Sequence, residues 1–200
     1  MRVLLCVAVC LLCESGLKAT GSDGTTDLHR AVYRDDLPAV QQLLRKGADV
    51  KAVNRYGVTP LSLACANGNG TIVELLLQAG ADAKGTLPGG ETALMTAART
   101  GKVDAVKALL AHGADIHGRE IKRGQTALMW AAAEGHVEVV ETLLGAGAHI
   151  RGRLNSGFTP LLLAVREGQI PVVRALLKAG ADVNDTIRPA EASGPRPASG

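Results

Sequence analysis

The sequence predicts an all-α fold in which five helix-turn-helix units stack in a row as a solenoid. Segments of similar sequence begin at five threonines that are spaced 33, 33, 34 and 33 residues apart: Thr26, Thr59, Thr92, Thr126 and Thr159. Five glycines near the ends of these segments keep the same spacing: Gly47, Gly80, Gly113, Gly147 and Gly180. A period in this range is typical of stacked repeats. Aromatic residues are only 2% of the chain, so the units must pack as thin helices through alanine rather than through aromatic layers.

The first helix of each unit has a recognisable start and end. Thr126 precedes "ALMWAAAE", a run of good helix formers, and Pro60 and Pro160 directly follow the equivalent threonines. Threonine at the cap and proline at the first helical position are start signals. Gly135 is expected to end this helix, because glycine readily adopts the left-handed backbone conformation of a helix terminus.

A second helix is predicted to follow in each unit. In the fourth unit its apolar residues Val139, Val140, Leu143 and Leu144 share one face by helical spacing, and Gly147 ends it. An extended polar connection then leads to the next unit. Isolated helices shorter than about 12 to 15 residues are marginal in water, so stability must come from stacking on neighbouring units.

The repeats resemble those of the ankyrin family. "GVTPLSLACANGNGTIVELLLQAGAD", "GETALMTAARTGKVDAVKALLAHGAD", "GQTALMWAAAEGHVEVVETLLGAGAH" and "GFTPLLLAVREGQIPVVRALLKAGAD" follow the family pattern, and a fifth match begins at Thr26. The resemblance covers residues 25–188, with repeats at about 25–55, 56–88, 89–122, 123–155 and 156–188, and implies helix pairs joined by β-hairpin-like loops. The extra residue of the 34-residue period lies between Asp115 and Thr126 and predicts a longer loop there.

One element of the family pattern is mostly missing. Only the first repeat keeps the histidine of the family's T-P-L-H turn, as His29, whereas the other repeats have Ser62, Met95, Met129 and Leu162. The turn hydrogen bond of the family is therefore in question for these four repeats, although apolar replacements can add packing.

The two ends of the chain differ from the repeats. Residues 1–19 combine a cationic start, the apolar run "VLLCVAVCLLC" and Ala19, which predicts a secretory signal peptide and export to a periplasm or outside the cell. The run is shorter than the roughly 20 residues of a membrane span, and the alternative is an uncleaved membrane-surface anchor. Residues 20–24 are predicted to form a short linker, and the Pro/Gly/Ser-rich residues 189–200 a disordered tail. Signal removal leaves Cys65 alone, so no internal disulfide is expected.

No catalytic, cofactor or metal site is predicted. The histidines occupy repeat positions or flank glycines, and His117 has only His112 nearby as a further ligand. Glycines recur singly at helix ends and form no phosphate-binding loop. The sequence therefore predicts a module without enzyme activity. Nucleic acid is not an expected partner, because the net charge is only +3 and aromatic stacking residues are scarce.

The sequence favours a module that binds another protein. By resemblance to ankyrin proteins, the partner contacts the loop tips and the concave face of the first helices. Within each repeat the pair ending the first helix varies while its surroundings repeat, which marks as candidates Tyr33, Arg34, Asn67, Arg99, Glu134 and Arg166. Trp130 is also a candidate, because tryptophan is enriched among the hot spots of interfaces. It is a secondary one, since its position predicts partial burial between first helices.

The loop tips are rich in positive charge. The centre of this bias is expected at Arg119, Arg123, Arg151 and Arg153, which would attract an acidic partner surface. A rim of charges that serves only solubility is an equally weighted alternative.

The two terminal repeats differ in how they face solvent. Asp35, Asp36, Gln41 and Gln42 give the first repeat a polar outer side. The last repeat keeps the interior pattern at Val172, Val173, Leu176 and Leu177, so we expect a longer chain, self-association through this repeat or coverage by the tail. Two further functions remain open from the sequence: the substrate-recognition or regulatory part of a longer enzyme, and a structural spacer.

Overall fold

The computed structural model describes residues 23–187, and within them the chain forms ten helices. In chain order these are α2 (Asp27–Tyr33), α3 (Leu37–Arg45), α4 (Pro60–Asn67), α5 (Gly70–Gln78), α6 (Ala93–Thr100), α7 (Val103–Ala111), α8 (Ala127–Glu134), α9 (Val137–Gly145), α10 (Pro160–Arg166) and α11 (Ile170–Lys178). The predicted signal peptide, most of the predicted linker and the predicted tail lie outside the described residues.

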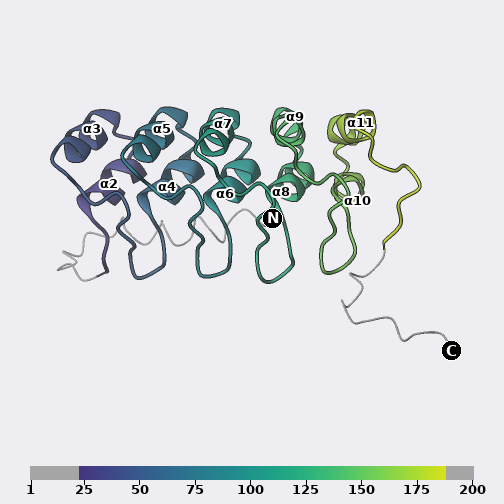
Figure 1. Ribbon diagram of the computed structural model, residues 1–200, viewed down its shortest axis with the longest axis horizontal. Coiled ribbons are helices and arrows are strands. Elements are labelled where there is room, and N and C mark those ends of the chain that lie inside the picture. The colour runs from purple at the N-terminus through teal and green to yellow at the C-terminus, as the bar shows by residue number, and fades with distance from the viewer. Residues whose placement is uncertain (1–22, 188–200) are drawn as a thin grey trace.

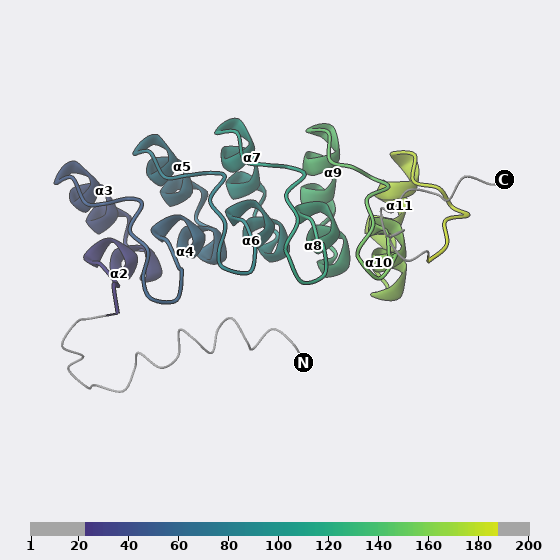
Figure 2. The same ribbon diagram turned by 60° about the horizontal axis from the view of Figure 1, so that its bottom comes forward.

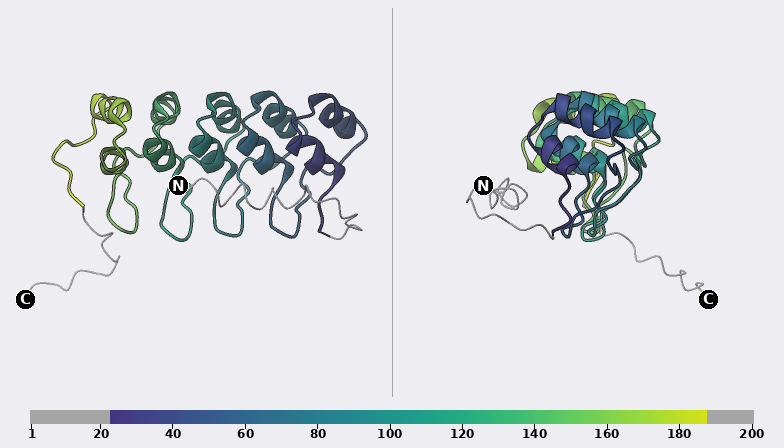
Figure 3. Two further views of the ribbon diagram at one scale, coloured as in Figure 1. Left: turned by 180° about the vertical axis from the view of Figure 1, so that it is seen from behind. Right: turned by 90° about the vertical axis from the view of Figure 1, so that its left-hand side faces the viewer.

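The helices form two parallel rows, as the all-α solenoid prediction requires (Figure 1). The first helices α2, α4, α6, α8 and α10 make one row, and the second helices α3, α5, α7, α9 and α11 make the other. The connections between repeats project beyond the first-helix row (Figures 1 and 3). We call them the first to fourth fingers, residues 46–59, 79–92, 112–126 and 146–159. The helix axes turn gradually along the stack (Figure 2), so the solenoid is twisted.

Threonine begins every first helix, as the sequence predicts. In each repeat its side chain accepts a hydrogen bond from the backbone N–H three residues later, and proline occupies the first turn of α4 and α10. The reciprocal bond of the turn forms in two repeats. Thr26 N donates to His29 Nδ1 at 3.2 Å, and Thr59 N donates to Ser62 Oγ at 3.0 Å. Ser62 thus replaces histidine in this bond, whereas Met95, Met129 and Leu162 have no side-chain acceptor that could form it.

Gly135 shows why glycine separates the two helices of a repeat. Its φ of 86° is in the left-handed region, and an added Cβ would lie 2.4 Å from Gln169 Oε1 of the next repeat. Gln169 crosses this glycine to donate from Nε2 to the carbonyl oxygen of Ala133 at 3.2 Å. In the preceding repeat pair, His136 makes the equivalent bond to Arg99 O at 2.9 Å. The glycine therefore permits both the turn and the tie to the neighbouring repeat.

A continuous apolar core runs between the two helix rows. Val139, Val140 and Leu143 of the second helix are fully buried, and the alanines that let first helices approach closely, such as Ala131 and Ala132, are also fully buried. Cys65 occupies an equivalent small-residue position and is a buried free thiol, as predicted. Burial raises the pKa of the Cys65 thiol to about 12.

Each finger closes like a β-hairpin without forming an extended strand in the described part of the chain. Leu154 N donates to Phe158 O at 2.8 Å in the fourth finger, and the second finger contains an isolated antiparallel bridge between Thr86 and Thr92. In the third finger the corresponding bond, from Glu120 N to Gln125 O at 3.0 Å, spans one residue more. The predicted longer finger is therefore present.

The terminal repeats expose different surfaces. Asp35, Asp36 and Gln42 are exposed in the first repeat, as its predicted polar outer side requires. In the last repeat Val172 and Leu176 are buried within the chain, whereas Ile170 is 62% exposed and Leu177 38% exposed. Between residues 23 and 187 no helix is long and apolar enough to cross a bilayer.

Candidate functional site

The candidate site lies on the surface of the first-helix row beside the fingers, which we call the inner face. Three positions of each repeat contribute to it: the residue before the cap threonine, the fourth residue after it and the seventh residue after it. In the third to fifth repeats these positions hold Glu91, Thr96 and Arg99, then Gln125, Trp130 and Ala133, then Phe158, Leu163 and Arg166.

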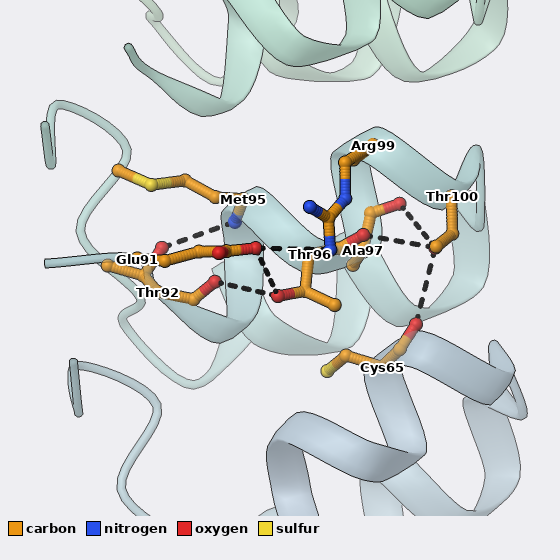
Figure 4. A network of polar contacts seen from close by, with 8 residues as sticks. All are labelled: Cys65, Glu91, Thr92, Met95, Thr96, Ala97, Arg99 and Thr100. Carbon is orange, nitrogen blue, oxygen red and sulfur yellow. Dashed lines mark hydrogen bonds and ion pairs between the residues drawn. The ribbon is translucent and has the colours of Figure 1, made fainter. Parts of the chain in front are cut away.

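Arg99 is held in one orientation by its neighbours (Figure 4). Its Nη2 lies 3.3 Å from Glu91 Oε1, and Thr96 Oγ1 donates to the same carboxylate oxygen at 3.2 Å. The guanidinium carbon lies 5.2 Å from the centre of the Trp130 ring. A guanidinium fixed by an ion pair and an aromatic ring loses little further freedom when it binds a ligand.

Trp130 is partly buried and packs against the core, which confirms the predicted burial between first helices. Its indole Nε1 and the side-chain oxygen Oε1 of Gln125 are the two buried side-chain polar atoms without a hydrogen-bond partner within residues 23–187. Gln125 and Trp130 occupy the positions of Glu91 and Thr96, which bond to each other one repeat earlier. The inner face of the fourth repeat therefore contains a buried donor and a buried acceptor with unused capacity.

Arg166 repeats the arginine–aromatic arrangement at the end of the stack. Its guanidinium carbon lies 5.0 Å from the Phe158 ring centre, and its Nη2 lies 2.7 Å from Glu167 Oε1. The side chain remains 52% exposed. Surface ion pairs of this kind contribute little, so Arg166 can exchange Glu167 for an external carboxylate.

The other residues predicted from the variable pairs are of two kinds: some are exposed, and one bonds to the preceding repeat. Tyr33, Arg34 and Glu134 are exposed at the ends of α2 and α8. The Asn67 side chain instead donates to Val32 O at 2.8 Å and so caps a helix of the preceding repeat. Asn67 therefore contributes to the connection between repeats as well as to the surface.

The four predicted fingertip arginines fall into two groups. Arg119 Nη2 donates to the carbonyl oxygen of Arg153 at 2.6 Å, and Arg153 donates to Gly157 O and Thr186 O at 2.9 Å each. Arg153 also pairs with Asp185. Arg123 and Arg151 are exposed, and no hydrogen bond or ion pair engages their side chains in the described chain. The structure thus uses Arg119 and Arg153 to connect fingers and leaves Arg123 and Arg151 accessible.

Partial burial raises the pKa of Asp185, but the hydrogen bonds from Arg153 and Thr159 and the charge of Arg153 outweigh this effect. The pKa of Asp185 is therefore below its usual value. An ionised Asp185 is the form that holds Arg153 in place.

Sequence reasoning missed Glu91, Gln125 and Phe158 as inner-face residues. The position before the cap threonine holds Thr25, Val58, Glu91, Gln125 and Phe158 in the five repeats. This position therefore varies, while the threonine that follows it is the same in every repeat. The same contrast within the repeats that marked Arg99 and Arg166 would have identified this position.

The histidines of neighbouring fingers make a ring contact. The rings of His117 and His149 stack with their centroids 4.0 Å apart. Residues 23–187 contain no group of three or more His, Cys, Asp or Glu side chains arranged to hold a metal ion.

A known protein family matches most of the chain. A family model described as ankyrin repeats in three copies matches residues 5–87, 28–120, 80–153 and 117–187. No curated protein matches the chain.

Proposed function

Because the chain belongs to the ankyrin repeat family, whose repeats generally act as non-catalytic protein–protein interaction modules, we propose that it binds a partner protein through its inner face and fingertips. The observation that carries this proposal is the pair of arginine–aromatic contacts on the inner face. Arg99 lies over Trp130, and Arg166 lies over Phe158. Tryptophan, tyrosine and arginine are the residues most enriched among the hot spots of protein interfaces.

Charge on the fingertips supports an acidic partner surface. Arg123 and Arg151 extend from neighbouring fingers, and Lys122 is exposed beside Arg123. Long-range attraction by such charges increases the rate of association and weakens as salt is added. The partner therefore presents carboxylates toward the fingertips, while the inner face supplies the close contacts.

The proposal is tested by capture of partners from cells of the source organism with a matched pair of variants. Arg123→Glu/Arg151→Glu reverses charge at two fingertip arginines whose side chains make no hydrogen bond or ion pair in the described chain. Arg45→Glu/Arg174→Glu makes the same change at exposed positions of α3 and α11, in the second-helix row. A genuine partner is recovered with the native protein and the second variant and lost with the first. Recovery that is equal with all three proteins contradicts the proposed surface.

Export of the protein is a second part of the proposal, supported by the sequence of residues 1–19. The test is N-terminal sequencing of the protein recovered from envelope and secreted fractions. A mature N-terminus near residue 20 agrees with export, and recovery of the uncleaved chain in the cytosol contradicts it.

A further inference from the structure

A hollow of about 530 Å³ lies on the inner face where the third finger, the fourth finger and α10 meet. Lys122, Arg123 and Gln125 of the third finger line one side, and Leu154, Leu163 and Arg166 line the floor and the other side. A volume of this size falls within the roughly 300–1,000 Å³ range of pockets that hold small ligands or side chains. Nothing in the predicted repeat pattern requires a hollow at this place.

The third finger, which contains the extra residue, builds the wall of the hollow. The Glu120 carboxylate accepts hydrogen bonds from the backbone N–H groups of Lys122 at 2.7 Å, Arg123 at 2.6 Å and Gln125 at 3.2 Å. Asn155 N of the fourth finger donates to Arg123 O at 2.9 Å. The tip is thus fixed on both sides, and this wall of the hollow is formed before any ligand arrives.

The charges around the hollow favour an anion. Lys122, Arg123 and Arg166 contribute three positive charges, and Glu167 is the one carboxylate that lines it. The nearby Glu120 carboxylate is directed to the backbone of its own finger. Leu154 and Leu163, which are 5% and 1% exposed, provide an apolar floor suited to the methylene groups of an acidic side chain.

Gln125 indicates what else the ligand must carry. The residue is only 5% exposed, it lines the hollow, and its Oε1 is closed to solvent and accepts no hydrogen bond. A buried acceptor without a donor is costly, and a ligand group that brings an N–H or O–H satisfies it once the Gln125 side chain turns this oxygen toward the hollow. The ligand therefore combines a negative charge for the cations with a hydrogen-bond donor for Gln125.

We propose that this hollow binds an acidic side chain of an extended segment of the partner protein. The carboxylate lies among Lys122, Arg123 and Arg166, and a main-chain N–H of the same segment donates to Gln125. Peptides offer both groups at short range together with methylene groups for the apolar floor of Leu154 and Leu163, whereas hydrogen phosphate offers only a charge and an O–H. The inference rests on the proposed function and names the chemistry that the partner presents to the fourth and fifth repeats.

The direct test is a titration of the ¹⁵N-labelled protein with hexaglutamate blocked at both ends. Trp130 is the single tryptophan, so its indole N–H gives one resonance beside Gln125 on the inner face. Blocked hexaglutamine controls for the backbone alone, hexaglutamine with a free C-terminus tests a terminal carboxylate, and inorganic phosphate tests a simple anion. We expect saturable shifts at Lys122, Arg123, Gln125 and Trp130 with hexaglutamate only. Equal shifts with phosphate or with the free C-terminus overturn the proposal.

Variants then locate the contact. Arg166→Gln removes a charge from the hollow, Gln125→Leu removes the acceptor, and Arg174→Gln removes an exposed charge from α11 as the matched control. We expect each of the first two variants to bind hexaglutamate about tenfold more weakly, as for the loss of a charged or buried hydrogen bond, and the control to bind as the native protein does. Equal weakening by Arg166→Gln and Arg174→Gln indicates general charge attraction and overturns the proposal.

Gln125→Leu also tests a competing role of the Gln125 amide, in which its oxygen only accepts a hydrogen bond from the indole N–H of Trp130. In that case the variant lowers the melting temperature but leaves hexaglutamate affinity unchanged, and the proposed contact is wrong. Arg166 is exposed, so Arg166→Gln keeps the test valid if Gln125→Leu does not fold.

Failure of this inference is distinguishable from failure of the proposed function. A partner that the fingertip variant no longer captures, but that hexaglutamate does not displace, supports the binding function and rejects the hollow as its acidic site. Binding of hexaglutamate in the hollow without any captured partner supports the acidic site and leaves the proposed partner-binding function without support.

Discussion

Individual residues in this solenoid serve two neighbours at once. His29 accepts from Thr26 N within its own repeat and donates from Nε2 to Val58 O of the next repeat at 3.0 Å. Gln169 and His136 reach back across a glycine to the preceding repeat. Because a helix of seven to nine residues cannot persist alone, such paired contacts at the residue scale hold each repeat in register with the next.

Cys65 illustrates the protection that stacking gives to a single side chain. The thiol is fully buried and its pKa is raised to about 12, so the reactive thiolate is scarce at neutral or mildly alkaline pH. We expect Cys65 to resist iodoacetamide at pH 8 in the folded protein and to react fully in 6 M guanidinium. Peptide mass mapping measures both states. Rapid labelling of Cys65 without denaturant contradicts the buried assignment.

Gly135 and Gly145 predict opposite effects of the same substitution. Gly135→Ala puts a Cβ at positive φ and against Gln169, so we expect a loss of about 1–2 kcal/mol in the free energy of unfolding. Gly145 is the last residue of α9, and an added Cβ would meet nothing within 4 Å. Gly145→Ala should gain about 0.5–1 kcal/mol through higher helix propensity.

Urea titrations of the native protein and both glycine variants check these values. The paired design separates backbone strain from a general effect of adding a methyl group. Equal changes in the two variants, in either direction, contradict the role assigned to Gly135.

At the scale of the elements, the fingers are connected to one another as well as to the helices. Arg119 bonds to the backbone of Arg153, and Arg153 bonds to Gly157 and to the connection after α11. These arginines belong to the predicted basic centre, yet their side chains lie along the row of fingers. Arginine is suited to such positions because its planar group donates several hydrogen bonds at once.

The Arg153–Asp185 pair predicts a pH dependence of the last finger contact. The pKa of Asp185 is lowered in the folded protein, so its contribution is present above the unfolded value near pH 4 and is lost as pH falls through the folded value. We expect Asp185→Asn to be about 0.5–1 kcal/mol less stable than the native protein at pH 7, and this difference to disappear near pH 2. Urea titrations at both pH values measure it. A difference that persists at pH 2 contradicts ionic stabilisation by Asp185.

The first helices follow closely from the sequence, because each one begins at a threonine whose side chain caps it. Thr126 caps α8 and Gly135 ends it, which are properties of one or two residues. The positions of Arg99 and Arg166 also follow from the repeat register. The use of Arg119 and Arg153 does not, because a long side chain can point to solvent or to the next finger from the same sequence position. Gln125 could have been found from its variable position, but its unsatisfied oxygen depends on packing with the neighbouring repeat.

At the scale of the whole molecule, residues 23–187 form a row of units in which each packs against its neighbours. Within residues 23–187 each interior repeat has a neighbour on both sides, whereas the last repeat has a neighbour on one side and exposes Ile170 and Val165. In such an array stability is close to a sum of repeat terms and nearest-neighbour terms. The proposed binding hollow lies between the fourth and fifth repeats, so the interface that shapes it is also the one nearest this exposed end.

This asymmetry predicts different costs for one substitution at equivalent positions. Leu143 of α9 and Leu176 of α11 are both fully buried, but α9 lies between two neighbouring helices of its row and α11 has one. Truncating a buried leucine costs about 3–5 kcal/mol where the cavity cannot collapse and less where the surroundings can relax. We therefore expect Leu143→Ala to cost about 3–4 kcal/mol and Leu176→Ala about 2–3 kcal/mol. Hydrogen exchange should also show that α10 and α11 open before α6 and α8 in the native protein. Equal costs together with uniform exchange along the stack would mean that the five repeats unfold as one unit, and the end of the solenoid would then not limit the stability of the hollow.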